Sequence, residues 1–140
     1  MKTRSLRGRL TDTNVKQLIV DDGRLTNGYK VKEFHVWVNG GGEAGVYAVL
    51  GKEYDMVSGG DASDARQIAW AGNAWSTGIN NGATMWSIID PDHVVLQDLY
   101  IQRINPADAC NYLIVLEQMT LTNDESILQL IKERSQDDTR

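Results

Sequence analysis

The sequence has little of several residue types, and each shortage excludes a class of protein. Its single cysteine, Cys110, excludes an internal disulfide framework and a metal cage built on cysteines. No apolar run approaches the ~18 residues that a membrane-spanning helix needs. The first ten residues lack the apolar core of a secretory signal, although a processed form would have lost one. Internal repeats, low-complexity linkers and heptads are also missing, so we expect a soluble domain with no membrane segment.

The composition that remains is that of an ordinary globular domain. The chain has 140 residues, of which 41% are hydrophobic and 24% are charged. A domain of this size buries ~68% of its unfolded surface, which is enough for a core without disulfides or metals. We therefore expect one domain.

Charge is distributed unevenly along the chain. The first ten residues contain no acidic residue and four cations, Lys2, Arg4, Arg7 and Arg9. The formal net charge is −5, so the rest of the chain carries −9. The sequence thus predicts a basic N-terminal arm, residues 1–10, before an acidic domain, residues 11–140. Arg4, Arg7 and Arg9 could contact nucleic acid or an acidic neighbour; the alternative is a solvated, partly disordered terminus. The acidic domain argues against nucleic-acid binding elsewhere.

Two long apolar-rich segments, His93 to Ile104 and Cys110 to Leu121, organise the C-terminal half. Both alternate with period two, which is typical of β-strands. The five residues between them, Asn105 to Ala109, include turn formers and a proline, so the sequence predicts a hairpin. The stretch from Tyr112 to Leu116 is apolar on both faces, which predicts a central strand covered on each side.

Shorter strands separated by glycine-rich turns are predicted in the first part of the chain. They are Val15–Val20, Tyr29–Val38, Val46–Leu50, Gln67–Gly72 and Ala83–Asp90. Small and polar residues predict loops at Gly51–Ala65 and Gly72–Gly82. The predicted fold class is mainly β, an antiparallel sandwich or barrel that is jelly-roll-like, with a C-terminal amphipathic helix.

The helix is predicted over about residues 123–135. Thr122 and Glu125 have the spacing of a capping box. An apolar stripe follows, formed by Ile127, Leu128, Leu130 and Ile131. A helix of about three turns is marginal alone, so we expect it to dock on the sheet or on a neighbouring subunit. Ile127, Leu130 and Ile131 are the candidates for that contact.

No motif for catalysis, metal binding or a cofactor emerges from the sequence. His35 and His93 are far apart, and the aspartates beside His93 are interpreted as turn caps. Asp61 and Asp64 lack the spacing of a calcium loop. No serine lies in a nucleophile motif, no carboxylate pair stands out, and no glycine tract has a phosphate-binding fingerprint. We predict no enzymatic activity, no metal and no cofactor.

Aromatic residues are the most suggestive candidates for binding. Trp37, Trp70 and Trp86 fall on predicted strands and are interpreted as core or sheet-face residues. Trp75 lies among small residues in a predicted loop, where an exposed indole could stack on a sugar or anchor a partner.

The ending of the chain resembles small β-barrel or β-sandwich structural proteins of bacteriophage virions, such as decoration, minor capsid or tail-accessory proteins. The similar residues are NYLIVLEQMTLTNDES, from Asn111 to Ser126, and IKERSQDD, from Ile131 to Asp138. The resemblance covers the C-terminal third and includes no diagnostic motif. It implies a subunit made in the host cytoplasm that joins the virion, binding other virion proteins and copies of itself, and it assigns no functional residue.

A different class of function stays open beside this one. The chain could be a carbohydrate-binding module or lectin-like domain that uses Trp75 and the carboxylates of the loops.

Overall fold

The structure is a computed structural model of the 140-residue chain. It describes residues 2–20, 23–24, 26–38, 45–56, 59–76, 82–104, 109–122, 124–125, 127–128 and 131, and for 74–76 and 82–84 it describes the backbone alone. The described residues form the strands β1 (Thr3–Leu10), β2 (Lys16–Ile19), β3 (Asn27–Val38), β4 (Val46–Gly51), β5 (Gln67–Ser76), β6 (Gly82–Ile89), β7 (Asp98–Arg103) and β8 (Cys110–Thr120). The predicted mainly β class is confirmed.

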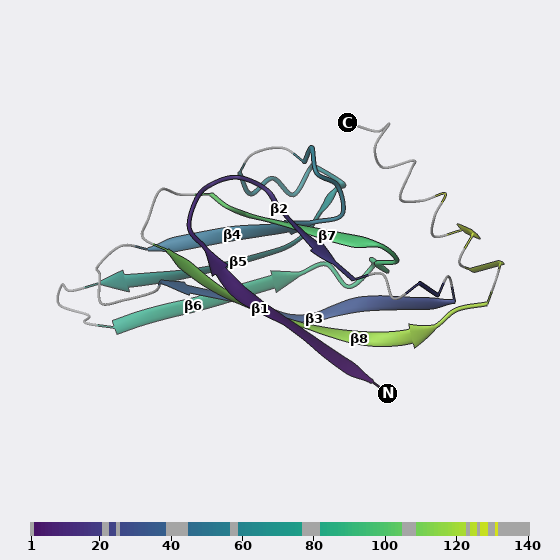
Figure 1. Ribbon diagram of the computed structural model, residues 1–140. Coiled ribbons are helices and arrows are strands. Elements are labelled where there is room, and N and C mark those ends of the chain that lie inside the picture. Colours follow the sequence, from purple (N-terminus) through teal and green to yellow (C-terminus); the bar gives the residue numbers. More distant parts are fainter. Residues whose placement is uncertain are drawn as a thin grey trace.

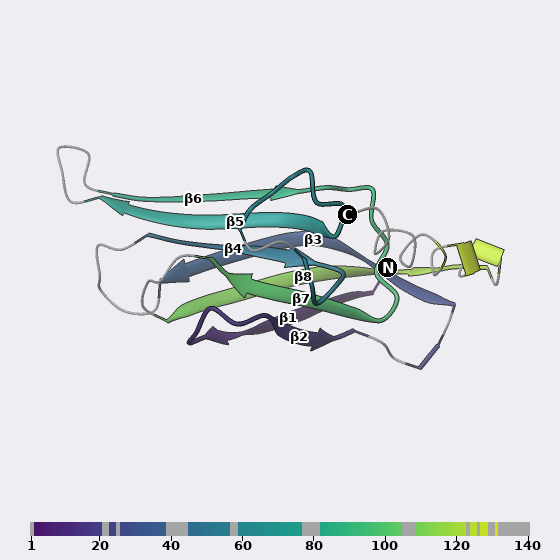
Figure 2. The same ribbon diagram turned by 90° about the horizontal axis from the view of Figure 1, so that it is seen from above.

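The strands form two antiparallel sheets (Figure 1). Sheet A has three strands in the order β1-β8-β3, and sheet B has five in the order β2-β7-β4-β5-β6. Figure 1 shows β4 and β5 lying above β3 and β8, and the view in Figure 2 places β6 and β2 at opposite margins of sheet B. Two layers thus enclose the interior.

Both sheets contribute to one apolar core. Its fully buried members include Phe34, Val36, Ile114 and Leu116 from sheet A and Leu50, Leu99 and Ile101 from sheet B. Burial of each large side chain of this kind stabilises the fold by ~1.5–3 kcal/mol. The alternation seen in the sequence therefore identifies which side chains face the other sheet.

Strand β8 is the centre of sheet A, as its apolar sequence predicted, but the described residues do not cover it on both faces. Cys110, Tyr112, Ile114 and Leu116 are buried, and the residues between them are half-buried. Among the described residues no second layer covers the outer face, so the cover on each side stays a prediction. Only one face of β8 packs against sheet B, and the other forms part of the outer face of sheet A.

The predicted hairpin between the two C-terminal strands is also wrong. β7 pairs with β2 and β4 in sheet B, whereas β8 pairs with β1 and β3 in sheet A. The chain between Ile104 and Ala109 therefore leads from one sheet to the other. Period two identifies a strand but not its partner, since sheet partners are chosen by non-local contacts.

The start of the first predicted C-terminal strand differs as well. Val94, Val95 and Leu96 are buried in succession, and Val95 makes an isolated bridge with Tyr29, with N–H···O distances of 2.9 and 2.8 Å. Val94 and Leu96 pack with Leu121 in a second, small cluster. This segment therefore contributes buried side chains without forming part of a strand, and β7 begins at Asp98.

The N-terminal segment is part of the fold rather than an arm before it. Thr3–Leu10 forms the edge strand β1, and each of its residues lies opposite a residue of β8. Leu10 is buried and Leu6 packs against the core. Arg4 donates to the carbonyls of Val20 (2.9 Å) and Ile19 (3.3 Å), which ties β1 to the end of β2.

Strand β5 extends further than the sequence predicted. It continues through Ser76 and pairs along its length with β6, so that Trp75 lies opposite Ala83. The prediction of a loop starting at Gly72 was wrong. Small residues there reflect close packing: a β-carbon added at Gly72 would lie 2.5 Å from the indole of Trp86.

Most of the predicted C-terminal helix, about 123–135, lies outside the described residues, so the helix stays a prediction. Its first turn has the predicted capping contacts, since the Glu125 N–H donates to Thr122 Oγ1 (3.1 Å) and the Thr122 N–H to Glu125 Oε2 (3.0 Å). Ile127, Leu128 and Ile131 are 51%, 57% and 54% exposed. Each of these three residues is therefore more exposed than buried.

Candidate functional site

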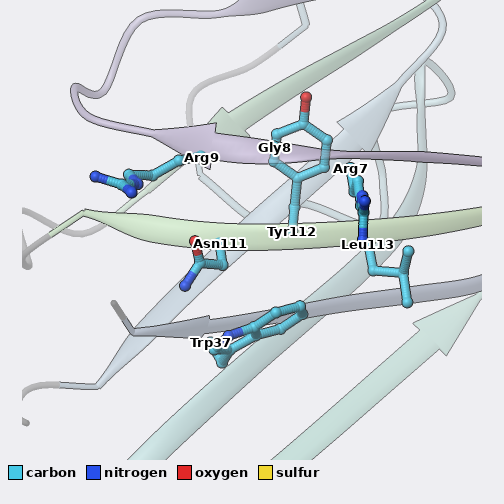
Figure 3. A pocket seen from close by; sticks show the side chains of 7 residues that line it. All are labelled: Arg7, Gly8, Arg9, Trp37, Asn111, Tyr112 and Leu113. Carbon is cyan, nitrogen blue, oxygen red and sulfur yellow. The ribbon is translucent and has the colours of Figure 1, made fainter. Parts of the chain in front are cut away.

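A shallow hollow of about 460 Å³ lies on sheet A where its three strands run side by side (Figure 3). We call it the sheet A hollow, and its lining is Arg7, Gly8, Arg9, Trp37, Asn111, Tyr112 and Leu113. Arg9 lies opposite Asn111, which lies opposite Trp37, so one residue of each strand forms a row. The next row contains Arg7 and Leu113.

The outer face carries the polar and aromatic groups of this hollow. Trp37 is 38% exposed, and Arg7 and Arg9 are exposed beside it. Within the described part of the chain, neither arginine has an acidic partner within 4.0 Å. An indole face, two guanidinium groups and the Asn111 amide together can stack on a ring and bind an oxyanion or hydroxyl groups.

Tyr112 forms the inner boundary of the hollow, and Gly8 makes its position possible. Figure 3 shows the Tyr112 ring extending across β1 at Gly8. A β-carbon on Gly8 would lie 2.8 Å from the Tyr112 hydroxyl oxygen. Lys16 Nζ lies 5.6 Å from the ring centroid, within reach of a cation–π interaction. The glycine in the strand thus marks a close approach rather than a turn.

A second hollow, of about 440 Å³ and strongly polar, lies beside the β4–β5 connection. Its charged and aromatic lining is Lys52, Asp64, Trp70, Asp90, Asp92 and His93. His93 Nε2 lies 2.9 Å from Asp90 Oδ2, and the Asp92 N–H donates to Asp90 Oδ1 (3.1 Å). The Asp92 N–H bond, followed by the nearby His93, lowers the pKa of Asp90 despite partial desolvation. Asp90 therefore caps the turn after β6, as the sequence indicated.

Asp64, which lines this polar hollow, belongs to a buried network centred on Arg66. The Arg66 side chain is 1% exposed and binds Asp64 through Nε–Oδ1 (2.8 Å) and Nη2–Oδ2 (3.1 Å). Its other nitrogen, Nη1, donates to the Asp55 carbonyl (2.8 Å). The hydrogen bonds to Asp64 raise the pKa of Arg66 above its usual value. These groups bind one another, so the network fixes the loop.

Gln67 secures the same loop from the next position. Its side-chain amide donates to the Gly59 carbonyl (2.7 Å) and its oxygen accepts from the Asp61 N–H and the Trp70 indole, both at 2.8 Å. Asp61 in turn accepts bonds from the N–H and hydroxyl of Ser63 (2.9 and 2.6 Å), which lower the Asp61 pKa. The hydrogen bonds of Gln67 and Asp61 hold the described part of the loop, residues 59–66, against β5, and we assign the polar hollow a structural role.

The structure separates the residues that the sequence singled out. Arg7 and Arg9 line the sheet A hollow, whereas Arg4 is engaged with the carbonyls that end β2. Trp75 is on a strand and not in a loop, and its side chain is outside the described part.

The predicted helix residues divide in the same way. Ile127 and Ile131 are exposed, and Leu130 lies outside the described residues.

The sequence did not single out Trp37 and Asn111 as a pair. Trp37 was interpreted as a core or sheet-face residue, and it lies on the outer sheet face, next to Asn111. The only signal in the sequence was that Trp37 occupies the polar phase of a strand whose other phase is Phe34, Val36 and Val38.

Comparisons with known proteins supply no relative: no family model, curated protein or solved structure matches this chain. Among the described residues, no three His, Cys, Asp or Glu side chains are grouped so as to hold a metal ion. None of the helices in that part of the chain is long and apolar enough to cross a membrane.

Proposed function

We propose that this chain is a structural subunit of a virion, with a jelly-roll fold, and that it acts by self-assembly and not by catalysis. The observation that carries the jelly-roll part of the proposal is the order of strand pairing. In an eight-stranded jelly roll the first strand pairs with the last, the second with the seventh, the third with the sixth and the fourth with the fifth. Here β1 pairs with β8, β2 with β7 and β4 with β5.

The remaining pair departs from this order. β3 and β6 contact each other, but no ladder joins them among the described residues, and β6 pairs with β5 instead. Jelly rolls serve as viral capsid domains and as lectin domains, so the fold alone does not select a function.

Uncovered apolar side chains favour assembly. Met85, Trp86 and Ile88 on β6 are 52%, 40% and 59% exposed, and Ile127 and Ile131 near the C-terminus are more than half exposed. Several exposed apolar side chains on one strand, as on β6, are typical of surfaces that bind other proteins. A subunit that is completed by its neighbours fits these exposures and the resemblance to virion proteins at the C-terminal end.

Two measurements test the proposal. Sedimentation velocity of the purified protein should show association at micromolar concentration. Mass spectrometry should find the chain in purified virus particles whose genome encodes it. A protein that stays monomeric at micromolar concentration and is absent from such particles would refute the proposal.

A carbohydrate-binding function is the second candidate, and the sheet A hollow is the observation that favours it. Trp37 would stack on a sugar ring while Arg7, Arg9 and Asn111 bind its hydroxyl or carboxylate groups. On a glycan array the native protein should then bind acidic glycans. Binding should be lost in Trp37→Ala and retained in Trp86→Ala, which removes an equally exposed indole from the other sheet. An array without signal excludes this candidate.

A further inference from the structure

We propose that strand β6 pairs antiparallel with β6 of a second copy of this chain, so that two copies of sheet B become one continuous sheet across a twofold axis. The inference rests on the self-assembly proposed above and deepens it by naming the partner and the strand. It starts from the side chains of β6, its position at the edge of the sheet and the direction of its backbone groups.

Strand β6 is exposed on both of its faces. Met85, Trp86, Ser87 and Ile88 are consecutive and all four are exposed, which no other strand shows with three large apolar residues among the described side chains. Figure 2 shows the reason, because β6 lies at the margin of sheet B, beyond β3. Sheet A ends at β3, which lies near β6 without a ladder between the two strands in the described residues, and the side chains from Met85 to Ile88 stay exposed.

The other three sheet edges carry features that oppose pairing with another chain. β1 carries three arginines, β2 has only four residues and includes Lys16, and β3 has two lysines, a glutamate and a register shift between Val31 and Glu33. Charges, short length and bulges are the usual protections of edge strands. The sequence of β6, GATMWSII, contains no charge and no proline.

The absence of charge also favours an identical partner. When two copies of one strand pair antiparallel about a twofold axis, the residues near the axis lie close to their own counterparts, so a charged residue there would meet the same charge. β6 has no charged residue that could meet its own counterpart in any register.

The direction of the free backbone groups sets the register. The Asp90 N–H donates to the Ile68 carbonyl (2.9 Å), so residues 90, 88, 86 and 84 direct their backbone groups toward β5. Residues 89, 87, 85 and 83 then direct theirs toward the free edge. A twofold axis at Trp86 pairs all seven residues from 83 to 89, with Met85 opposite Ser87 of the second copy. Trp86 would lie opposite Trp86 in a non-hydrogen-bonded pair, where side chains are closest.

Substitutions test the surface by sedimentation velocity. The native chain should dimerise, and Ile88→Lys should raise the dimer dissociation constant at least tenfold. Ile19→Lys is the matched control, since Ile19 is 66% exposed on β2, the opposite edge of the same sheet, and it should leave dimerisation unchanged. Ser87→Pro removes one outward N–H without touching the β5 ladder and should act like Ile88→Lys. Circular dichroism reports whether each variant is folded. If Ser87→Pro unfolds, the dimerisation of Ile88→Lys decides whether β6 forms the interface.

A disulfide tests the register. Trp86→Cys should form an intermolecular disulfide on mild oxidation, because residues opposite each other in a non-hydrogen-bonded pair have Cβ atoms about 4.5–5.5 Å apart. Ile88→Cys, which would lie opposite Thr84, should crosslink several-fold less, and the buried Cys110 should not interfere.

The outcomes separate this inference from the proposed function. A native monomer, or a dimer that both Ile88→Lys and Ser87→Pro leave intact while folded, overturns β6 pairing, and in the second case self-assembly stands. A dimer broken by Ile88→Lys in a chain absent from virion particles supports β6 pairing and refutes the virion role.

Discussion

Arg66 is a charged side chain among the most deeply buried groups of this protein, and its partners decide whether that burial is tolerated. Its exposed fraction is 1%, and that of the Asp64 side chain is 3%. Removing one partner of a buried ion pair leaves the other charge desolvated and unpaired, which costs ~3–5 kcal/mol. The pair is therefore expected to stabilise the described parts of the connection between β4 and β5 only while both residues are present.

Arg66→Met should lower the free energy of unfolding by ~3–5 kcal/mol in urea titrations. Arg7→Met, at an exposed arginine with no acidic partner within 4.0 Å in the described residues, should change it by less than ~0.5 kcal/mol. The double variant Arg66→Met with Asp64→Asn should recover part of the loss. Equal effects of the two single arginine substitutions would contradict this account.

Cys110 is expected to be an unreactive thiol with a pH-dependent effect on stability. Burial raises its pKa to about 11 from an ordinary value of 9.0. Between these values the unfolded chain has lost the thiol proton and the folded chain has kept it, so stability falls as pH rises from 9 toward 11. Cys110→Ser should show a weaker decline of melting temperature over that interval.

A thiol reagent measures the same property directly. At pH 8 the native protein should react with a colorimetric disulfide reagent far more slowly than the urea-unfolded chain, since the thiolate is the nucleophile. Rapid stoichiometric labelling of the native protein at pH 8 would contradict the burial of Cys110.

Among the elements, β1 is the one whose role changes most between sequence and structure. Its inward residues Leu6 and Leu10 pack on the core, and Gly8 admits the ring of Tyr112. Deleting residues 2–10 should therefore destabilise the protein by ~3 kcal/mol or more, measured as a lower melting temperature or loss of soluble protein. The variant Arg7→Ser with Arg9→Ser removes the exposed cations and should keep the native melting temperature. An unchanged melting temperature after the deletion would instead support the alternative of a solvated terminus.

The sequence predicts the strands of this fold much better than their partners. Alternation located β2, β3, β4, β6 and β8, because one buried face imposes period two on each strand. It gave β7 too early a start, and it paired β7 with β8. Pairing depends on contacts between segments far apart in the chain, such as Arg9 with Asn111.

The sequence did not predict the N-terminal strand or the sheet A hollow, because both depend on contacts between segments far apart in the chain. Arg7 and Arg9 of β1 lie on its outward phase, and a segment of Arg, Ser and Gly resembles a polar tail as much as an edge strand. Trp37 gains its neighbours only when β3 and β1 flank β8. Likewise, the spacing of Asp64 and Arg66 does not reveal that both are buried.

At the scale of the whole molecule, the two sheets present two surfaces that suit different partners. The sheet A hollow carries positive charge at Arg7 and Arg9, which have no acidic partner within 4.0 Å among the described residues, on a chain of net charge −5. The β6 edge belongs to the other sheet and is uncharged. One surface is therefore suited to an anionic ligand and the other to a second copy, and a chain with both could assemble and bind at once.

The C-terminal segment adds the last test of assembly. Ending the chain after Thr122 removes Ile127, Leu128 and Ile131, which are exposed, and keeps Leu121, whose side chain is 7% exposed and whose N–H donates to the Thr26 carbonyl (2.6 Å). The truncated chain should therefore fold with nearly the native melting temperature, whereas Leu121→Ala should cost ~2–5 kcal/mol. If the segment ties neighbouring subunits together, truncation should abolish species larger than the dimer in sedimentation velocity and leave β6 pairing intact. An insoluble or unfolded truncated chain would show instead that the segment covers its own subunit.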